Sequence, residues 1–275
     1  SSVDILILVS QFRDHIIPCT ANILQEKLGL SNKCLAFDIP LGCSGYIYGM
    51  SVVSSMLSQP GLNRALLLVG DVSSQNISYH DRKAFPLFGD AGTATAIESC
   101  DSAKPMSFDL RTDGSGYDMI IIPDGGTRSP VTKNSFAKQR ISKGVMRSRT
   151  DVALKGKELF EFALREVAPN VNTLLKFMDL DKDSIDQFVF HQANRLMIEI
   201  IRKTLKIQPE KVPYSLDRFG NTITATIPLT IVTELREELS RNPMNILMSG
   251  FGIGLSWGAA VVELNNVVIP ELIEV

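Results

Sequence analysis

The stretch "AFDIPLGCSGYIYGM", residues 36–50, carries the clearest fold signal in the chain. Residues 36–39 are typical of a short buried strand, the Pro and Gly breakers follow at 40–45, and residues 45–57 have the small, apolar character of a packed helix. Cys43 therefore lies at or near a helix N-terminus, where unpaired N–H groups and the helix dipole favour an anion. Two interpretations stay open: a thiol biased toward the reactive thiolate, or a buried free cysteine that packs as a small hydrophobe.

Strand-like apolar runs alternate with helical patterns along the rest of the chain. Further strands are expected at residues 5–9, 65–69, 93–97, 188–190, 246–248 and 259–264. Helices are expected at residues 20–28, 45–57, 157–178, 195–205 and 225–238. This alternation predicts an α/β fold with mostly buried sheets.

The order of these signals occurs twice. We therefore expect two related halves, residues 1–150 and 151–275, with a polar loop or flap at 123–143 between the halves. In such a duplication Cys43 and Asn221 occupy equivalent turns at the N-termini of two facing helices, and His191 ends a strand on the same side. Ligands in open α/β sheets collect outside the carboxyl ends of the strands, so this edge is the expected site.

Composition and charge exclude several classes of protein. With 275 residues, 44% hydrophobic and 21% charged, the chain has the composition of a globular protein, and its net charge of -2 gives no global electrostatic case for nucleic acid. No apolar run approaches the length of a membrane span and the first residues lack a basic signal-peptide region, so we expect a cytoplasmic protein without a membrane partner. The four cysteines contain no CxxC pair, and we expect free thiols and no metal site.

Three short stretches are candidates for one site: "GCSG" with Cys43, "HQAN" with His191 and "GNT" with Asn221. A cysteine thiolate can accept an acyl group, and His and Asn can each donate a hydrogen bond to a thioester carbonyl that becomes an oxyanion. Taken singly, a His after a strand is more often structural and an Asn after Gly is usually a turn residue. Together, in a duplicated context, the three indicate acyl transfer more specifically.

The sequence resembles the β-ketoacyl-acyl-carrier-protein synthase III family of the thiolase superfamily. The resemblance rests on "AFDIPLGCSGYIYGMS", "FGDAGTATAI", "LRTDGSGYD", "LKGKELFEFA", "HQANRLMIEII", "LDRFGNTITATIP" and "GFGIGLSWGAAVVEL", which run in the family's order from near residue 1 to about residue 264. It implies a thiolase-like fold of two related α/β halves in five layers, αβαβα. It also implies that the strands and helices which precede "VDILILVSQ" in the family are absent from this sequence.

The resemblance implies a decarboxylative condensing enzyme, an acyltransferase of fatty acid or related biosynthesis that needs no cofactor. Cys43 would take the acyl group from an acyl-CoA primer, and His191 and Asn221 would hold the thioester carbonyl of malonyl-acyl carrier protein. Loss of CO₂ would give a carbanion that attacks acyl-Cys43. The backbone N–H groups of Cys43 and Ile253 would hold the oxyanion of this step. Ile253 stands where the family usually has Gly, so we expect a reshaped acyl pocket.

The remaining expectations concern the pocket and the partners. The resemblance places Phe88 in the acyl pocket and sends Ile17 across the interface of a homodimer into the partner's acyl channel. A basic face of the helix at 195–205 is expected to dock the acidic carrier protein, with an ordinary solvated face as the alternative: Arg195, Arg202, Lys203 and Lys206.

Two other functions stay open. One is a non-catalytic or partner-dependent homologue that binds an acyl carrier protein, and the other is a Cys43–His191 hydrolase that releases free acid without a malonyl donor. The condensing-enzyme hypothesis predicts that Cys43 is alkylated faster than the chain's other cysteines and that acyl-CoA protects it. The sequence does not identify the acyl chain.

Overall fold

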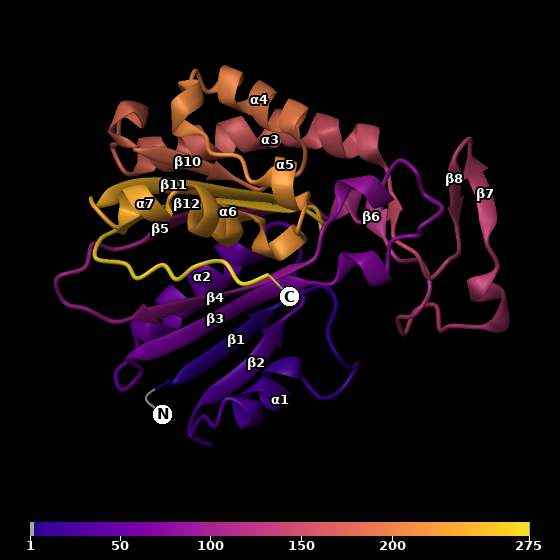
Figure 1. Ribbon diagram of the computed structural model, residues 1–275, viewed down its shortest axis with the longest axis horizontal. Helices are drawn as coiled ribbons and strands as arrows, with labels where there is room; N and C mark the ends of the chain where they lie inside the picture. The colour runs from indigo at the N-terminus through magenta and orange to yellow at the C-terminus, as the bar shows by residue number, and fades with distance from the viewer. Residues whose placement is uncertain (1–2, 275) are drawn as a thin grey trace.

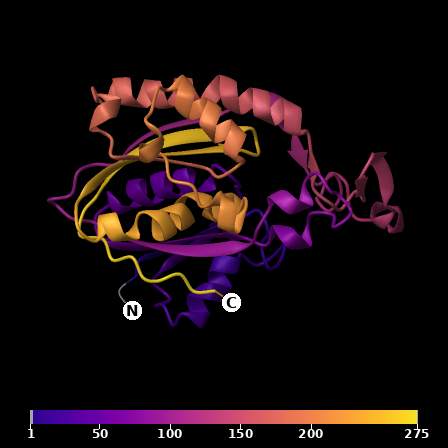
Figure 2. The ribbon, with the colours of Figure 1, turned by 45° about the horizontal axis from the view of Figure 1, so that its top comes forward.

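The computed structural model describes residues 3–274 and consists of two stacked sheets with helices outside and between them (Figures 1 and 2). From bottom to top in Figure 1 the layers are α1, the first sheet, a central helical layer, the second sheet, and α3 with α4. This is the five-layered αβαβα order that the resemblance implies.

The first sheet has the strand order β2 (Leu35–Ile39), β1 (Ile5–Val9), β3 (Arg64–Asp71) and β4 (Ala91–Glu98). The first three strands are parallel, and β4 runs antiparallel to β3. Strand β1 reads ILILV, with four of its five residues buried, as expected for a strand covered on both faces. One cover is α1 (Thr20–Lys27), which packs against β1 and β2.

The second sheet has the order β10 (Gln187–Phe190), β11 (Met244–Gly252), β12 (Ser256–Leu264) and β5 (Ser107–Thr112). Strands β10 and β11 are parallel, and the other two pairings are antiparallel. Its outer face is covered by α3 (Gly156–Phe177) and α4 (Arg195–Thr204), which bury their apolar faces in one continuous core with the sheet.

The central layer is formed by α2 (Gly45–Leu57) and α6 (Thr226–Glu234). Helix α2 packs against β1 and β3 on one side and against β11 and β12 on the other, so it is apolar nearly all round. The helix expected at 225–238 is divided at Leu235 into α6 and the short α7 (Arg236–Leu239), and another short helix, α5 (Leu216–Phe219), precedes the layer.

The boundary between the halves differs from the expected 150/151. Strand β5 lies far upstream of that point but pairs antiparallel with β12, so the second sheet already begins at residue 107. Pairing between residues about 150 positions apart leaves no mark in a local pattern, so a strand signal at residues 107–112 would not identify the sheet that the strand joins.

The flap contains more regular structure than a loop. Strands β6 (Ile120–Ile121) and β9 (Ala153–Leu154) pair as its stem, and β7 (Gln139–Ser142) and β8 (Val145–Arg147) form a hairpin beyond it. The hairpin projects from the body at the right of Figure 1. Over residues 3–274, no helix combines the length and the hydropathy needed to cross a membrane.

Candidate active site

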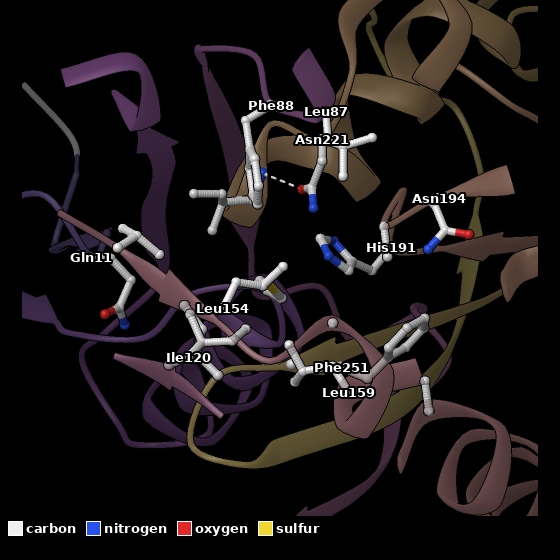
Figure 3. Close-up of a pocket in the computed structure, with 18 of the residues that line it drawn as sticks. Gln11, Leu87, Phe88, Ile120, Leu154, Leu159, His191, Asn194, Asn221 and Phe251 are labelled. Atoms are coloured by element: carbon white, nitrogen blue, oxygen red, sulfur yellow. Dashed lines mark hydrogen bonds between the residues drawn. The ribbon is translucent and has the colours of Figure 1, made fainter. Parts of the chain in front are cut away.

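The chemically reactive side chains of both halves line one cavity of about 470 Å³. Cys43 and Phe88 come from the first half, and His191, Asn221 and Ile253 come from the second. Figure 3 shows the His191 ring and the Asn221 amide directed toward one another across this space. The structure therefore brings together five residues that the sequence predicted for the site.

Cys43 lies in the turn between β2 and α2. The turn is closed by a hydrogen bond of 2.6 Å from Gly45 N to Gly42 O, and Ser44 follows as the N-cap residue of α2. Strand β11 approaches the turn so closely that a Cβ at Gly252 would lie 2.7 Å from Cys43 Cβ and 2.9 Å from its Sγ. Only glycine fits there without displacing the nucleophile.

A hydrogen-bond chain joins the Cys43 turn to the loop that contains Ile253. The hydroxyls of Ser44 and Ser256 lie 2.7 Å apart, and Ser256 Oγ donates to Ile253 O at 2.7 Å. The backbone N–H groups of Ile253 and of Cys43 itself both interact with the thiol sulfur. The two expected oxyanion donors therefore both lie close to the Cys43 sulfur.

Burial of Cys43 opposes the thiolate that a helix N-terminus favours. Its side chain is only 7% exposed, and burial raises the pKa of Cys43 to about 12. The N–H groups of Ile253 and Cys43 act in the opposite direction, whereas the negative charge of Asp71 raises the pKa further. Loss of hydration outweighs the backbone donors, so the thiol is neutral near pH 7.

Asp71 is a buried carboxyl group that the sequence analysis missed. It ends β3 and accepts hydrogen bonds from Ser10 Oγ, Gln11 N and both the N–H and the hydroxyl of Thr224, at 2.6–3.1 Å. These donors come from both halves, so Asp71 joins the loop after β1 to the loop that carries Asn221. Burial raises the pKa of Asp71, and these hydrogen bonds oppose the shift. An aspartate that directly follows the apolar run "ALLLVG" was the available signal.

His191 follows β10 and is held from two directions. Its N–H donates to Ser249 O, and its ring packs edge-to-face on Phe251 at 5.5 Å between centroids. Nδ1 lies 2.7 Å from Thr226 Oγ1, which leaves Nε2 as the ring nitrogen available to the cavity. Burial lowers the pKa of His191 to about 3, so the imidazole is neutral near pH 7.

Asn221 is fixed through its backbone and its side chain. Its N–H donates to Leu87 O at 2.8 Å, and its carbonyl accepts from Gly89 N at 3.1 Å, which seats it against the loop that holds Phe88. The amide oxygen accepts from Ile223 N at 3.0 Å, the dashed line in Figure 3. Because the oxygen is occupied, the amide nitrogen is the group presented to the cavity, as an oxyanion donor requires.

The cavity walls are mostly apolar and come from segments that the sequence analysis did not assign to the site. The flap stem and α3 supply much of the lining: Ile120, Ile121, Ile122, Val152, Leu154, Leu159, Phe162 and Ala163. Gln11 and Asn194 are polar exceptions in this lining, and the Gln11 amide donates to Pro40 O at 3.1 Å. Gln11 lies two residues after the end of β1, on the same sheet edge as Cys43, so its position was predictable in principle.

The predicted docking residues and Ile17 lie outside the cavity. Ile17 is 84% exposed on the loop between β1 and α1. On α4, Arg195 pairs with Asp217 and lies over the Tyr214 ring. Arg202 is only 11% exposed, because it binds Glu199 and the Ile207 carbonyl. Lys203 and Lys206 are exposed.

Family models match both halves of the chain. The model described as 3-oxoacyl-[acyl-carrier-protein (ACP)] synthase III matches residues 37–114, and the model of its C-terminal part matches residues 175–264. These ranges include Cys43 in the first match and His191, Asn221 and Ile253 in the second.

Individual relatives align with nearly the whole chain. A putative 3-oxoacyl-[acyl-carrier-protein] synthase 3 of Campylobacter jejuni is 32% identical over 274 residues, covering 99% of this chain and 76% of the relative. The β-ketoacyl-[acyl-carrier-protein] synthase III of Prochlorococcus marinus is also 32% identical, over 95% of this chain and 76% of the relative. The crystal structure of a 3-oxoacyl-(acyl-carrier protein) synthase from Burkholderia xenovorans LB400 superposes with a TM-score of 0.91 at 37% identity, over 98% of this chain and 76% of that one. The chain belongs to the 3-oxoacyl-[acyl-carrier-protein] synthase III family, and its fold is the family's thiolase-like fold.

Proposed function

We propose that this protein condenses an acyl group, transferred from an acyl-CoA to Cys43, with malonyl-acyl carrier protein, releasing CO₂ and forming a β-ketoacyl-acyl carrier protein. The observation that carries the proposal is the convergence of Cys43, His191 and Asn221 on one apolar cavity in a chain of this family. Relatives named β-ketoacyl-[acyl-carrier-protein] synthase III supply the substrate classes.

In the first half-reaction Cys43 Sγ attacks the acyl thioester and the coenzyme A thiol leaves. The thiol must lose its proton during this step, because burial keeps it neutral beforehand. The neutral imidazole of His191 lines the same cavity and can relay the proton to the departing thiol. The N–H groups of Cys43 and Ile253 stabilise the tetrahedral oxyanion.

In the second half-reaction the malonyl thioester carbonyl lies between His191 Nε2 and the Asn221 amide nitrogen. The electron pair released with CO₂ develops as an enolate on this carbonyl oxygen, where the two donors stabilise it. The carbanion then attacks the acyl carbon on Cys43, and the carbon–sulfur bond breaks. The Thr226 hydroxyl donates to Ile223 O at 3.1 Å, so it accepts from a protonated Nδ1, and only by turning its hydrogen from Ile223 O toward Nδ1 does it permit the tautomer with the proton on Nε2.

The apolar walls supply the acyl pocket of the proposed reaction. Ile253 lines the cavity, and its Cδ1 would meet a Cβ on Gly42 at 2.9 Å, so its side chain fills the space beside the nucleophile turn. Phe88 lines the cavity as well. The exposure of Ile17 suits a residue that reaches the acyl channel of a second copy in a homodimer, as the family resemblance implies.

Intact-protein mass spectrometry tests the proposal. The protein is incubated with a panel of acyl-CoA thioesters, with Cys43→Ala as the matched control, and malonyl-acyl carrier protein is then added. One acyl adduct, absent from Cys43→Ala and converted to β-ketoacyl product by the malonyl donor, supports condensation and identifies the primer. Free acid without a malonyl requirement would instead support a hydrolase, and no adduct from any primer would support a non-catalytic carrier-binding role.

A further inference from the structure

One residue of the Asn221 turn has a backbone conformation that its side chain disfavours. Ile223 has a φ of 54°, in the left-handed region, where a β-branched residue is rarely found. A conformation of this kind persists at a functional site only where the surrounding structure imposes it. Contacts from outside the turn must therefore hold Ile223 in place.

Ile223 orients both donors that the proposed condensation uses. Its N–H donates to the Asn221 amide oxygen at 3.0 Å, which leaves the amide nitrogen for the cavity. Its carbonyl accepts from Thr226 Oγ1 at 3.1 Å, and that hydroxyl lies 2.7 Å from His191 Nδ1. The N–H and the carbonyl of one strained residue therefore act on an amide and, through a hydroxyl, on an imidazole.

The contacts that hold this residue come from Asp71, through Thr224. One carboxylate oxygen of Asp71 accepts from Thr224 N at 3.1 Å and from Thr224 Oγ1 at 2.6 Å, and we call these two bonds the Asp71–Thr224 tie. The other oxygen accepts from Ser10 Oγ at 3.0 Å and from Gln11 N at 2.8 Å. Asp71 is only 3% exposed and forms no ion pair within residues 3–274, so hydrogen bonds alone compensate its burial.

The four donors around Asp71 suit a carboxylate and not its isosteric amide. Two of the donors are backbone N–H groups, Gln11 N on one oxygen and Thr224 N on the other, and a backbone N–H cannot become an acceptor. An amide at this position would place its NH₂ group opposite one of the two, whichever way it turned. Asp71→Asn therefore leaves a backbone donor unpaired beside the site.

The tie also fixes the Asn221 turn against the Cys43 turn. Thr224 Cγ2 lies 3.3 Å from the place where a Cβ on Gly45 would stand, and Ile223 Cγ2 lies 3.5 Å from the corresponding place on Gly42. These glycines stand on either side of Cys43, so residues 223–224 pack against both ends of the turn that carries the thiol. Holding Thr224 therefore holds the two donors relative to the sulfur as well.

We propose that Asp71 is a positioning residue for both donors, Asn221 and His191. It acts through Thr224 and the strained Ile223. The inference rests on the proposed condensation for the task of the two donors. Asp71 is not one of the described residues that line the cavity, so it affects the reaction through the turn and not by contact with a substrate.

The two half-reactions should respond differently to loss of the tie. His191 is also held by Ser249 O and by the Phe251 ring, whereas the Asn221 amide oxygen accepts from Ile223 N. Loosening the tie should therefore impair condensation more than acylation. A tie that serves only the stability of the fold would favour neither half-reaction.

Substitutions at both ends of the tie test the proposal in single turnovers. Thr224→Val removes the hydroxyl donor and keeps the N–H, Thr224→Ser keeps both donors, and Asp71→Asn removes the charge. Acyl-Cys43 protein, freed of excess acyl-CoA, is mixed with malonyl-acyl carrier protein, and the acylation rate is measured separately. We expect Thr224→Val and Asp71→Asn to lower condensation about tenfold or more and acylation less than about threefold, with natural rates in Thr224→Ser. Equal losses in both half-reactions, unchanged condensation, or a loss in Thr224→Ser as large as in Thr224→Val would overturn the proposal.

Amide hydrogen exchange tests the tie without turnover. The N–H groups of residues 223 and 224 donate to Asn221 and Asp71, so peptides covering 221–226 should exchange about tenfold faster in Thr224→Val and Asp71→Asn. Ser10→Ala, which removes a buried hydroxyl from the other oxygen of Asp71, is the matched control and should leave exchange in these peptides unchanged.

The exchange rates also separate this inference from the proposed function. Unchanged exchange at 221–226 in Thr224→Val and Asp71→Asn, or faster exchange throughout the chain, would contradict a local positioning role. Failure of the natural protein to condense would defeat the proposed function, and the exchange rates would still decide whether Asp71 holds the two donor side chains.

Discussion

The turns that precede the two central helices occupy equivalent places in the halves but are built differently. The Cys43 turn is packed against glycines of β11 and surrounds its functional atom with apolar groups and two backbone donors. The Asn221 turn has its N–H, its carbonyl and its amide oxygen all in hydrogen bonds. The Cys43 turn acts by burying its thiol, whereas the Asn221 turn acts by fixing the orientation of its amide.

This difference suits a reaction with two half-reactions. A buried neutral thiol is unreactive until a substrate occupies the cavity, which limits reaction with unrelated electrophiles. A fixed amide donor requires no reorganisation when charge develops on the malonyl carbonyl. Perturbing the Cys43 turn should therefore affect acylation, and perturbing the Asn221 turn should affect condensation.

Of three effects that concern the Cys43 turn, the largest contrasts its buried thiol with an exposed one. Hydrogen bonds with Ser102 lower the pKa of Cys100, whereas burial raises the pKa of Cys43 to about 12. Because alkylation needs the thiolate, iodoacetamide should modify Cys43 about 10- to 100-fold more slowly than Cys100 near pH 8, the reverse of the order expected from sequence. The Cys43 rate should rise about tenfold per pH unit toward pH 11, measured by peptide mass spectrometry. A plateau near neutral pH would show that the helix N-terminus outweighs burial.

Widening the Cys43 side of the cavity should have an intermediate effect. Ile253→Gly removes the side chain that reaches Gly42 and retains the backbone donor. Discrimination between acyl chains that differ in bulk should shift about tenfold toward the larger chain. Competition between paired acyl-CoA substrates measures this ratio, with the acylation rate of the smallest primer as the control. An unchanged ratio would place the acyl chain elsewhere in the cavity.

Loosening the link between the Cys43 turn and the Ile253 loop should have the smallest effect. Ser256→Ala removes the bridge between Ser44 and Ile253 O and leaves a buried hydroxyl without its partner. The free energy of unfolding should fall by about 1–2 kcal/mol in urea titrations. Ser58→Ala, which removes only an exposed bond to Ser55 O, is the control and should stay within about 0.5 kcal/mol. An equal fall in the free energy of unfolding of both variants would show that the bridge has no specific stabilising role.

Local patterns predicted much of the fold. Strand β1 and helix α2 begin and end at the residues expected, and the breakers around Cys43 predicted its turn. Long-range pairing was not predictable in the same way: β5 joins the second sheet only through its contacts with β12, and the polar flap gave no sign of its hairpin.

The candidate site shows the same limit. Cys43, His191 and Asn221 adjoin breakers at the ends of apolar runs, so they were found from sequence. Asp71 and Thr226 were missed because their importance depends on contacts with residues 153 and 35 positions away. The sequence left a thiolate and a buried neutral thiol both open at Cys43, because the burial that opposes the thiolate is visible only when both halves enclose the turn.

Separate measurement of the two half-reactions in Asn221→Ala tests the central claim most directly. Acylation of Cys43 by the identified primer is followed by intact-protein mass spectrometry, and condensation with malonyl-acyl carrier protein is followed by product formation. If the Cys43 turn serves acylation and the Asn221 turn serves condensation, Asn221→Ala should leave the acyl adduct unchanged and lower the condensation rate about 100-fold or more. A parallel loss of both steps, or condensation that persists at the natural rate, would contradict it.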